Sequence, residues 1–274
     1  DELSNVGIGQ YTITSAANIQ QVWDVTDLSN VIKYENTSGA TFAFKVNLGN
    51  QKKYVALDLS DTYTPLKEGN SVVQNQNLKG TIFNNNQGNF QDIDYLIITP
   101  QFLITQAERL ADFHRNNSGL SVRVVTLEKI YQEFSSGKQD IAAIRNLIKY
   151  VYWNASAPDK RVKYVNLFGD ASYDYKSRLF SNTNIVPVFH FFNPFSSDIN
   201  NISNMSLYSS FMSDDFFGLM DAGEGQMLGG FDGIDIAVGR MLVSNLNQAK
   251  EMVDKVVEYH DEKSYGRWRN NYVI

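Results

Sequence analysis

The stretch Tyr95-Leu96-Ile97-Ile98 is continuously apolar and runs directly into Thr99-Pro100. An apolar run of this length, without polar alternation, is typical of a β-strand buried on both faces of a parallel sheet. A helix is predicted after it, ending near Asn117 because Gly119 is a good stop signal. One apolar stripe supports this helix, made of Leu103, Ala107, Leu110 and Ala111.

The alternation of strand and helix continues downstream. Two more buried strands are predicted at 122–127 and at Tyr164–Phe168, and a helix capped by Asp140 lies between them. The apolar positions of that helix keep helical spacing: Ile141, Ile144, Leu147, Ile148 and Val151. Strands that alternate with helices predict an α/β fold with a parallel sheet and right-handed crossovers.

The pattern loosens after Asp174. Residues 185–189 are interpreted as a short edge strand, because Pro187 cannot donate to a central ladder. A further strand is predicted at 234–238, followed by a long helix that begins near Asn245. Its expected buried face consists of Ala249, Met252, Val253, Val256, Val257 and His260. Residues 272–274 resemble the first half of another buried strand, so we expect a second α/β unit to follow.

The first 91 residues are predicted to be β-rich. Thr41–Leu48 alternates apolar and polar residues, and Gly49-Asn50 suggests a hairpin with residues 53–58. Residues 82–91 are rich in Asn, Gln and Gly, which is typical of a linker or a domain boundary. We therefore expect a β-rich segment at 1–91, the end of an upstream β domain, and an α/β subdomain at 92–274.

Composition narrows the function classes. Apolar residues make up 43% and charged residues 20% of the 274 residues, the profile of a globular protein. The net charge of −6 argues against a nucleic-acid partner, and no apolar run is long enough to span a bilayer. The chain contains no cysteine, which excludes disulfides and a cysteine nucleophile within these residues.

The strongest chemical signal is Gly169-Asp170-Ala171-Ser172-Tyr173-Asp174, directly after the third strand. Open α/β sheets bind ligands at the carboxyl ends of their strands, where the strand order reverses. With the order second-first-third-fourth, Thr99 and Asp170 flank that reversal. Asp170, Ser172 and Asp174 share the first spacings of a calcium loop, but its later glycine and glutamate are missing. The alternative is that Asp170 caps its own loop.

A second acidic cluster is Ser213-Asp214-Asp215-Phe216-Phe217-Gly218. Its adjacent carboxylates suggest either a calcium site near Asp214 and Asp215, an acid–base pair, or caps of a loop. The histidines at 114, 190 and 260 lack metal-ligand spacing and are interpreted as structural.

Four motifs resemble, in order, the first subdomain of gingipain-type (C25-like) cysteine peptidases. They are Asp94-Tyr95-Leu96-Ile97-Ile98-Thr99, Leu167-Phe168-Gly169-Asp170-Ala171-Ser172, the 213–218 cluster and Asp235-Ile236-Ala237-Val238-Gly239-Arg240. Upstream, residues 21–26 and 75–78 resemble the β region before that domain in the sortase-type members of type IX secretion. The resemblance therefore covers nearly the whole chain.

The resemblance implies a pair of caspase-like subdomains, with a Cys/His dyad on the second one, downstream of a segment similar to 268–274. Neither dyad member has a counterpart here, so this chain is expected to be inactive alone. In the parent protein, a thiolate would attack a peptide carbonyl while histidine carries the proton. Sortase-type members cleave a C-terminal secretion signal from cargo and join the new end to a surface anchor.

The implied setting is the cell surface of a Gram-negative bacterium. The implied partners are the second peptidase subdomain, cargo with a C-terminal signal and other outer-membrane secretion components, and the family's domains carry calcium. Two other classes remain open at this point. One is a non-catalytic docking module of a secretion complex, and the other is an unrelated α/β hydrolase that uses Asp170 and Asp214.

Overall fold

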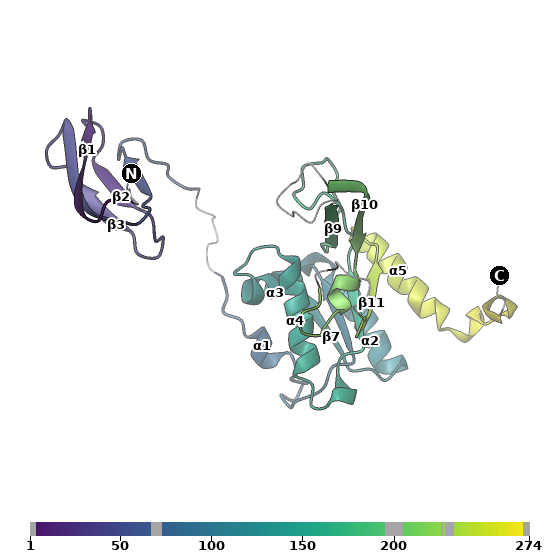
Figure 1. Ribbon diagram of the computed structural model, residues 1–274. Helices are drawn as coiled ribbons and strands as arrows, with labels where there is room; N and C mark the ends of the chain where they lie inside the picture. Colours follow the sequence, from purple (N-terminus) through teal and green to yellow (C-terminus); the bar gives the residue numbers. More distant parts are fainter. Residues whose placement is uncertain (1–3, 67–72, 195–204, 226, 228–232, 271–274) are drawn as a thin grey trace. The chain divides into compact units, whose positions relative to one another are not determined.

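The computed structural model describes residues 4–66, 73–194, 205–225, 227 and 233–270. It divides the chain into two compact units, Asp1–Val73 and Gln74–Ile274 (Figure 1). The division lies earlier than the predicted boundary at residue 91. Residues 82–91 do not form the predicted linker, because Ile82 and Phe83 are buried in the core of the second unit and Arg123 Nε donates to the Ile82 carbonyl at 2.9 Å.

The first unit is entirely β in its regular elements. Strand β1 (Gly7–Thr14) pairs antiparallel with β4 (Thr41–Leu48), and β2 (Gln21–Asp24) lies between β3 (Ile32–Glu35) and β5 (Tyr54–Leu57). The inner face of β4 is buried as its alternation predicts, and three of its side chains form the core of this unit with Ala16 and Val22: Phe42, Phe44 and Val46.

The predicted hairpin between β4 and β5 is wrong. Each of these strands pairs with an earlier strand, β4 with β1 and β5 with β2, in two different sheets. The alternation of β4 is satisfied equally by any partner that presents apolar residues, and β1 supplies them through Tyr11 and Ile13. A turn signal alone therefore did not determine which strands pair.

The second unit is built on a four-stranded parallel sheet. Its strands are β6 (Tyr95–Thr99), β7 (Val122–Thr126), β8 (Tyr164–Phe168) and β11 (Ala237–Met241), in the order β11-β8-β6-β7. All three neighbouring pairs are parallel. This confirms the predicted α/β class with a parallel sheet, and the strand order is the second-first-third-fourth order that was assumed for placing Thr99 and Asp170 at the reversal.

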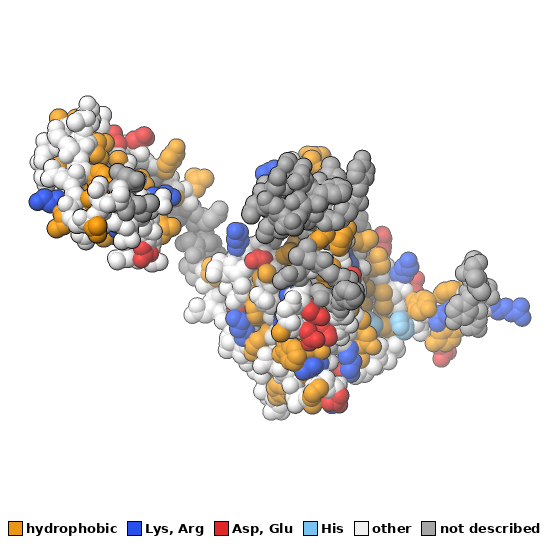
Figure 2. Space-filling view, in the orientation of Figure 1, with side chains coloured by type: hydrophobic (Ala, Val, Ile, Leu, Met, Phe, Trp, Pro, Cys, Tyr) orange, Lys and Arg blue, Asp and Glu red, His pale blue; other side chains and the backbone are white. Residues whose placement is uncertain are grey.

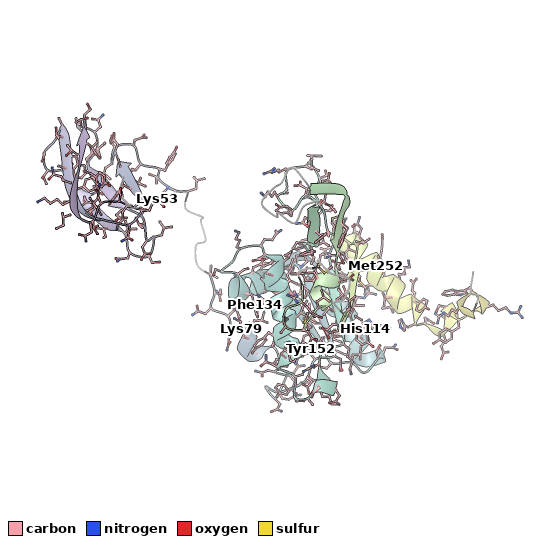
Figure 3. All side chains as sticks on the ribbon, viewed as in Figure 1. Lys53, Lys79, His114, Phe134, Tyr152 and Met252 are labelled. Carbon is pink, nitrogen blue, oxygen red and sulfur yellow. The ribbon has the colours of Figure 1, made fainter. Side chains whose placement is uncertain are left out.

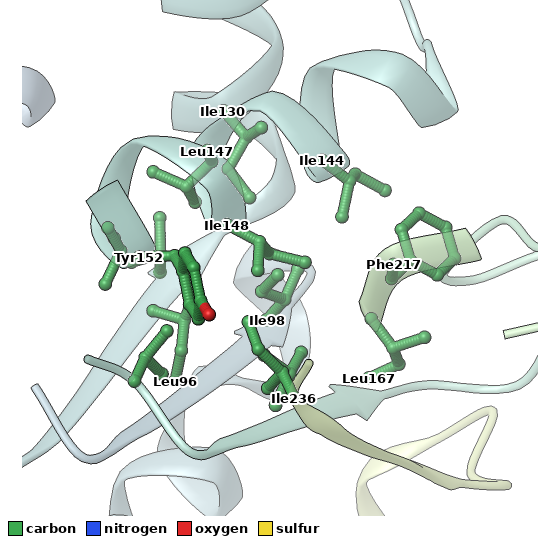
Figure 4. Close-up of a cluster of buried hydrophobic side chains, with 14 of the residues drawn as sticks. Leu96, Ile98, Ile130, Ile144, Leu147, Ile148, Tyr152, Leu167, Phe217 and Ile236 are labelled. Atoms are coloured by element: carbon green, nitrogen blue, oxygen red, sulfur yellow. The ribbon is translucent and has the colours of Figure 1, made fainter. Parts of the chain in front are cut away.

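Helices cover both faces of this sheet. α3 (Leu127–Phe134) and α4 (Ile141–Trp153) pack on one face, and α2 (Ile104–Asn117) and α5 (Leu246–Tyr259) pack on the other. Figure 4 shows the larger core, in which α4 residues such as Ile144 and Leu147 meet Ile98 and Leu167 of the sheet. The short helix α1 (Leu78–Thr81) also contacts α3.

Helix boundaries follow local signals. The Asp140 carboxylate accepts from the Ala142 backbone N–H and begins α4, and the Asn245 side chain accepts from the Gln248 N–H and begins α5. Gly119 has a φ of +66°, as a glycine after a helix should. α3 went unpredicted, although Leu127 and Ile130 are buried three residues apart at helical spacing.

Short 3₁₀ turns complete the unit at Gln101–Leu103, Pro158–Lys160, Asp215–Gly218, Glu262–Ser264 and Arg267–Asn270. β9 (Phe189–Pro194) and β10 (Met205–Ser213) form a separate antiparallel pair. The predicted further strand at 272–274 lies outside the described residues.

Two local predictions need correction. The strand expected at 234–238 is β11, which begins three residues later, because the Asp235 N–H and carboxylate bond instead to the backbone at Gly218 and Met220. His260 was expected on the buried face of α5 but is exposed, with its ring Nδ1 2.8 Å from the Val256 carbonyl oxygen.

Candidate functional site at the carboxyl end of the sheet

Asp170 stands where β8 ends and the strand order reverses between β8 and β6. Its backbone N–H donates to the Val243 carbonyl at 2.9 Å, and its carbonyl accepts from the Ile185 and Val186 N–H groups at 3.0 and 2.9 Å. The segment predicted as an edge strand at 185–189 therefore crosses the end of β8 instead of joining a ladder. Regular strand structure begins only at Phe189.

The carboxylates of the 169–174 loop bind groups of that loop and of the residues that follow it, up to Thr183. Asp170 accepts from the Ala171 N–H and from the Thr183 hydroxyl, both at 2.8 Å. Asp174, which is 9% exposed, accepts from the Leu179 N–H at 2.6 Å, and Ser172 Oγ accepts from the Asp174 N–H at 3.1 Å. These bonds support the interpretation that Asp170 caps its loop.

Gly169 allows a close approach at the same place. A Cβ atom at this position would lie 2.6 Å from Val186 Cγ2 and 2.8 Å from Ile185 Cγ2. Distances this short are not tolerated without movement, so only glycine lets the crossing segment pack directly on the end of β8. The glycine of this motif therefore has a packing role.

Arg240 and Asp214 form the most connected polar group of the site. Arg240 Nε and Nη2 donate to the two Asp214 oxygens at 2.8 and 2.6 Å, a bidentate pair. Arg240 Nη1 also donates to the carbonyls of Gly169 and Val186 at 2.9 and 2.7 Å. The Arg240 side chain is only 8% exposed. Through these hydrogen bonds its guanidinium connects β11 to the end of β8, to the crossing segment and to the 213–218 cluster.

The neighbouring carboxylate of Asp215 is not part of this group. Asp215 is exposed, its N–H donates to Ser213 Oγ at 3.0 Å, and the following Phe216, Phe217 and Gly218 are buried. Asp214 faces Arg240, so the structure does not bring the two aspartates into one acid–base pair.

Calcium was the metal predicted here. Both oxygens of Asp214 accept from Arg240, both oxygens of Asp170 accept from the Ala171 N–H and the Thr183 hydroxyl, and one oxygen of Asp174 accepts from the Leu179 N–H. Within the described ranges, no group of three or more His, Asp or Glu side chains is placed to hold a metal ion. The residues as arranged do not fit calcium, which needs six or more oxygen ligands.

Sequence reasoning found both Asp214 and Arg240 but not their pairing. It missed Thr183 and Val186, which hold Asp170 and Arg240 in place. The sequence carried no signal for them, because both belong to an irregular segment that crosses the end of β8. Gly239 has a different environment: nothing lies within 4 Å of where its Cβ would be.

Surface charge and hydropathy give two further findings. Figure 2 shows blue basic and red acidic side chains interspersed on the visible surface, without one continuous basic surface. Among the described residues, none of the helices has the length and apolar character needed to cross a membrane.

Comparisons with known proteins place this geometry in a family. No curated protein sequence matches the chain significantly. The crystal structure of dimeric latent PorU from Porphyromonas gingivalis is similar over 98% of this chain, with 26% identity and a TM-score of 0.69. The chain spans 25% of the length of that PorU chain. The model of peptidase family C25 matches residues 88–274, more than half of the sequence. The chain therefore belongs to peptidase family C25, and it is gingipain-type and PorU-like.

Proposed function

We propose that this chain is a non-catalytic α/β part of a C25 cysteine peptidase of the sortase type. One observation carries the proposal: the family match covers residues 88–274, yet the whole sequence has no cysteine. A cysteine peptidase needs a thiolate to attack the peptide carbonyl. In this proposal the thiolate and its histidine come from a second peptidase subdomain outside these residues.

The described residues contribute a rigid scaffold to that reaction. Arg240, Asp214 and Asp170 fix the loops at the carboxyl end of the sheet, the edge at which α/β proteins present ligands. Their side chains are held by internal bonds, so they position backbone and do not transfer protons. This arrangement gives little support to the alternative of an unrelated α/β hydrolase that uses Asp170 and Asp214.

The proposed substrate is cargo that carries a C-terminal secretion signal. The peptidase would cleave that signal and join the new end to a surface anchor, in contact with other outer-membrane secretion components of a Gram-negative bacterium. The support for this setting is the likeness to PorU and to the sortase-type members of the family. A docking role for this part within the same secretion complex is compatible with the proposal.

The test compares this chain with the polypeptide encoded by its complete reading frame, each incubated with a cargo protein that bears a C-terminal signal. We expect the complete protein to release the signal and a thiol-alkylating reagent to stop it, while the chain alone releases nothing. Signal release by the chain alone, or release by the complete protein that survives alkylation, would overturn the proposal.

A further inference from the structure

A pocket of about 570 Å³ lies on the second unit, at the amino-terminal half of the sheet strands and away from Asp170. It opens on the face that α2 and α5 cover, where Tyr95, Asn166 and Gly239 come from three neighbouring strands. His114, at the end of α2, forms one wall and is labelled in Figure 3. Its volume is in the range of pockets that bind small ligands.

Asn166 gives this pocket an unsatisfied polar group. Asn166 is 6% exposed, and its Nδ2 donates to the Tyr95 hydroxyl at 3.0 Å. Its other amide atom, Oδ1, is buried and has no hydrogen-bond partner among the residues that the structure describes. Leaving a buried polar atom unpaired costs free energy, so such an atom in a pocket indicates a missing partner.

The chemistry of Asn166 limits what that partner can be. A carboxamide can be turned over with little change of shape, so the free atom is an acceptor in one orientation and a donor in the other. A second amide group carries both a C=O and an N–H and satisfies either orientation. A hydrogen bond to an amide of the ligand is therefore a pairing that fits both cases.

The rest of the lining favours an uncharged ligand with a ring. The lining residues within the described ranges carry no Asp, Glu, Lys or Arg. Tyr95 stands edge-on to His114 and to Tyr164, with ring centroids 5.3 and 6.2 Å apart. Burial, and then the charge of His260, lower the pKa of His114, so its ring is uncharged at neutral pH.

Gly239 keeps the pocket open. Its absent side chain would meet nothing within 4 Å, and its φ is not in the left-handed region, so the backbone does not require glycine here. A Cβ with branches at this position would occupy the pocket beside Asn166. Neither backbone conformation nor close packing requires glycine at position 239 of the 235–240 motif, whereas keeping the pocket open does.

We propose that this pocket binds an uncharged amide group attached to an aromatic or branched apolar side chain, such as one unit of a peptide. The ligand amide pairs with the free amide atom of Asn166, and its apolar part lies against Tyr164 and Leu120. The site is separate from the carboxyl end of the sheet and does not depend on the proposed peptidase role.

The test uses the purified chain, with N-acetylphenylalaninamide as the probe and toluene as the amide-free control. Binding is followed by the shifts of backbone amide signals in two-dimensional NMR. We expect the probe to bind with a Kd of about 1 mM, usual for so small a ligand, and to shift the signals of Tyr95 and Asn166. Toluene should bind at least about tenfold more weakly.

Two variants and a matched control make the result decisive. Asn166→Leu removes the amide at similar volume, and Gly239→Val fills the pocket; both should abolish probe binding. Gly233→Val adds the same side chain at another open glycine and should bind like the parent chain. Binding that both variants retain, equal binding of toluene, or no binding at about 10 mM probe would overturn the proposal.

Discussion

Arg240 shows how much of the site depends on one side chain. Its guanidinium donates to Asp214, Gly169 and Val186, and the group is almost fully buried. Replacing one partner of a buried ion pair leaves the other charge without compensation, which is more costly than losing an exposed pair. The network therefore predicts a large and specific effect of substitution.

We expect Arg240→Met to lower the free energy of unfolding of the second unit by about 3 kcal/mol. The exposed pair between Lys250 and Asp254 is the control, and Lys250→Met should cost less than about 0.5 kcal/mol. Urea denaturation measures both. Equal effects of the two substitutions would show that the buried contacts of Arg240 add nothing.

Two glycines of the family motifs should behave in opposite ways. Gly169→Ala places a Cβ against Val186 and Ile185 and should destabilise the second unit by about 1–3 kcal/mol. Gly239→Ala meets open space and should change stability by less than about 0.5 kcal/mol. Thermal unfolding of the two variants distinguishes them, and a neutral Gly169→Ala would contradict the close approach described here.

Residue-level prediction succeeded where the cause was local. Asp140 was predicted to cap a helix and Asn245 was placed near a helix start, and in both cases the side chain caps an N–H group two or three residues away. The pairing of Asp214 with Arg240, and of Asp170 with Thr183, joins loops whose path the sequence pattern does not encode. These contacts could therefore be identified only from the structure.

At the scale of elements, the positions of buried strands were easier to predict than the partners with which strands pair. Apart from Thr99 and Asn166, β6 and β8 are apolar because both faces are covered, and their predicted ranges agree with the structure within one residue. β11 was placed too early, since Ile236 is buried but contributes no ladder bond. The pairing of β4 with β1 depended on the packing of aromatic side chains, which a turn signal does not specify.

A pair of histidines, His114 in α2 and His260 at the end of α5, should make the stability of the second unit depend on pH. The rings of His114 and His260 are 6.5 Å apart, and the pKa of His114 is lowered, mainly by burial and then by His260. The unfolded chain therefore takes up a proton near pH 6.5 while the folded chain does not. Stability should be complete above about pH 6.5 and should fall as the pH drops below it.

Urea midpoints at pH 7.5 and pH 5.5 measure this decline. His260→Gln removes one cause of the lowered pKa and should make the decline smaller, whereas His190→Gln, outside the pair, should leave it unchanged. A decline that is the same in all three proteins would rule out the histidine pair as its source.

At the scale of the whole molecule, the class of the α/β unit was predictable, whereas its limits were not. The alternation of strands with helices follows from the chain pattern alone, whereas the reversal at Asp170 depends on a strand order that the structure supplies. The segment 82–91 looked like a linker by composition, but Phe83 stacks on Phe90 at 5.1 Å and packs into the core. A segment of mostly polar composition can therefore belong to the core through a few buried apolar residues.

Calcium binding is tested on the intact chain. Because the carboxylates of Asp170, Asp174 and Asp214 already accept hydrogen bonds, we expect the same melting temperature in millimolar calcium and in chelator. A specific site filled to about 100 times its Kd would add about 2.7 kcal/mol of stability and a clear rise in Tm. Such a rise would show that the chain holds a calcium site that the described geometry does not contain.

The most direct measurement incubates the purified chain with a mixture of peptides and reads cleavage by mass spectrometry. Our account predicts no product beyond the buffer control, because the sequence has no cysteine and Asp170 and Asp214 are held by internal bonds. Cleavage that disappears in Ser172→Ala or Asp170→Asn would place a working nucleophile or base within this chain and contradict the account.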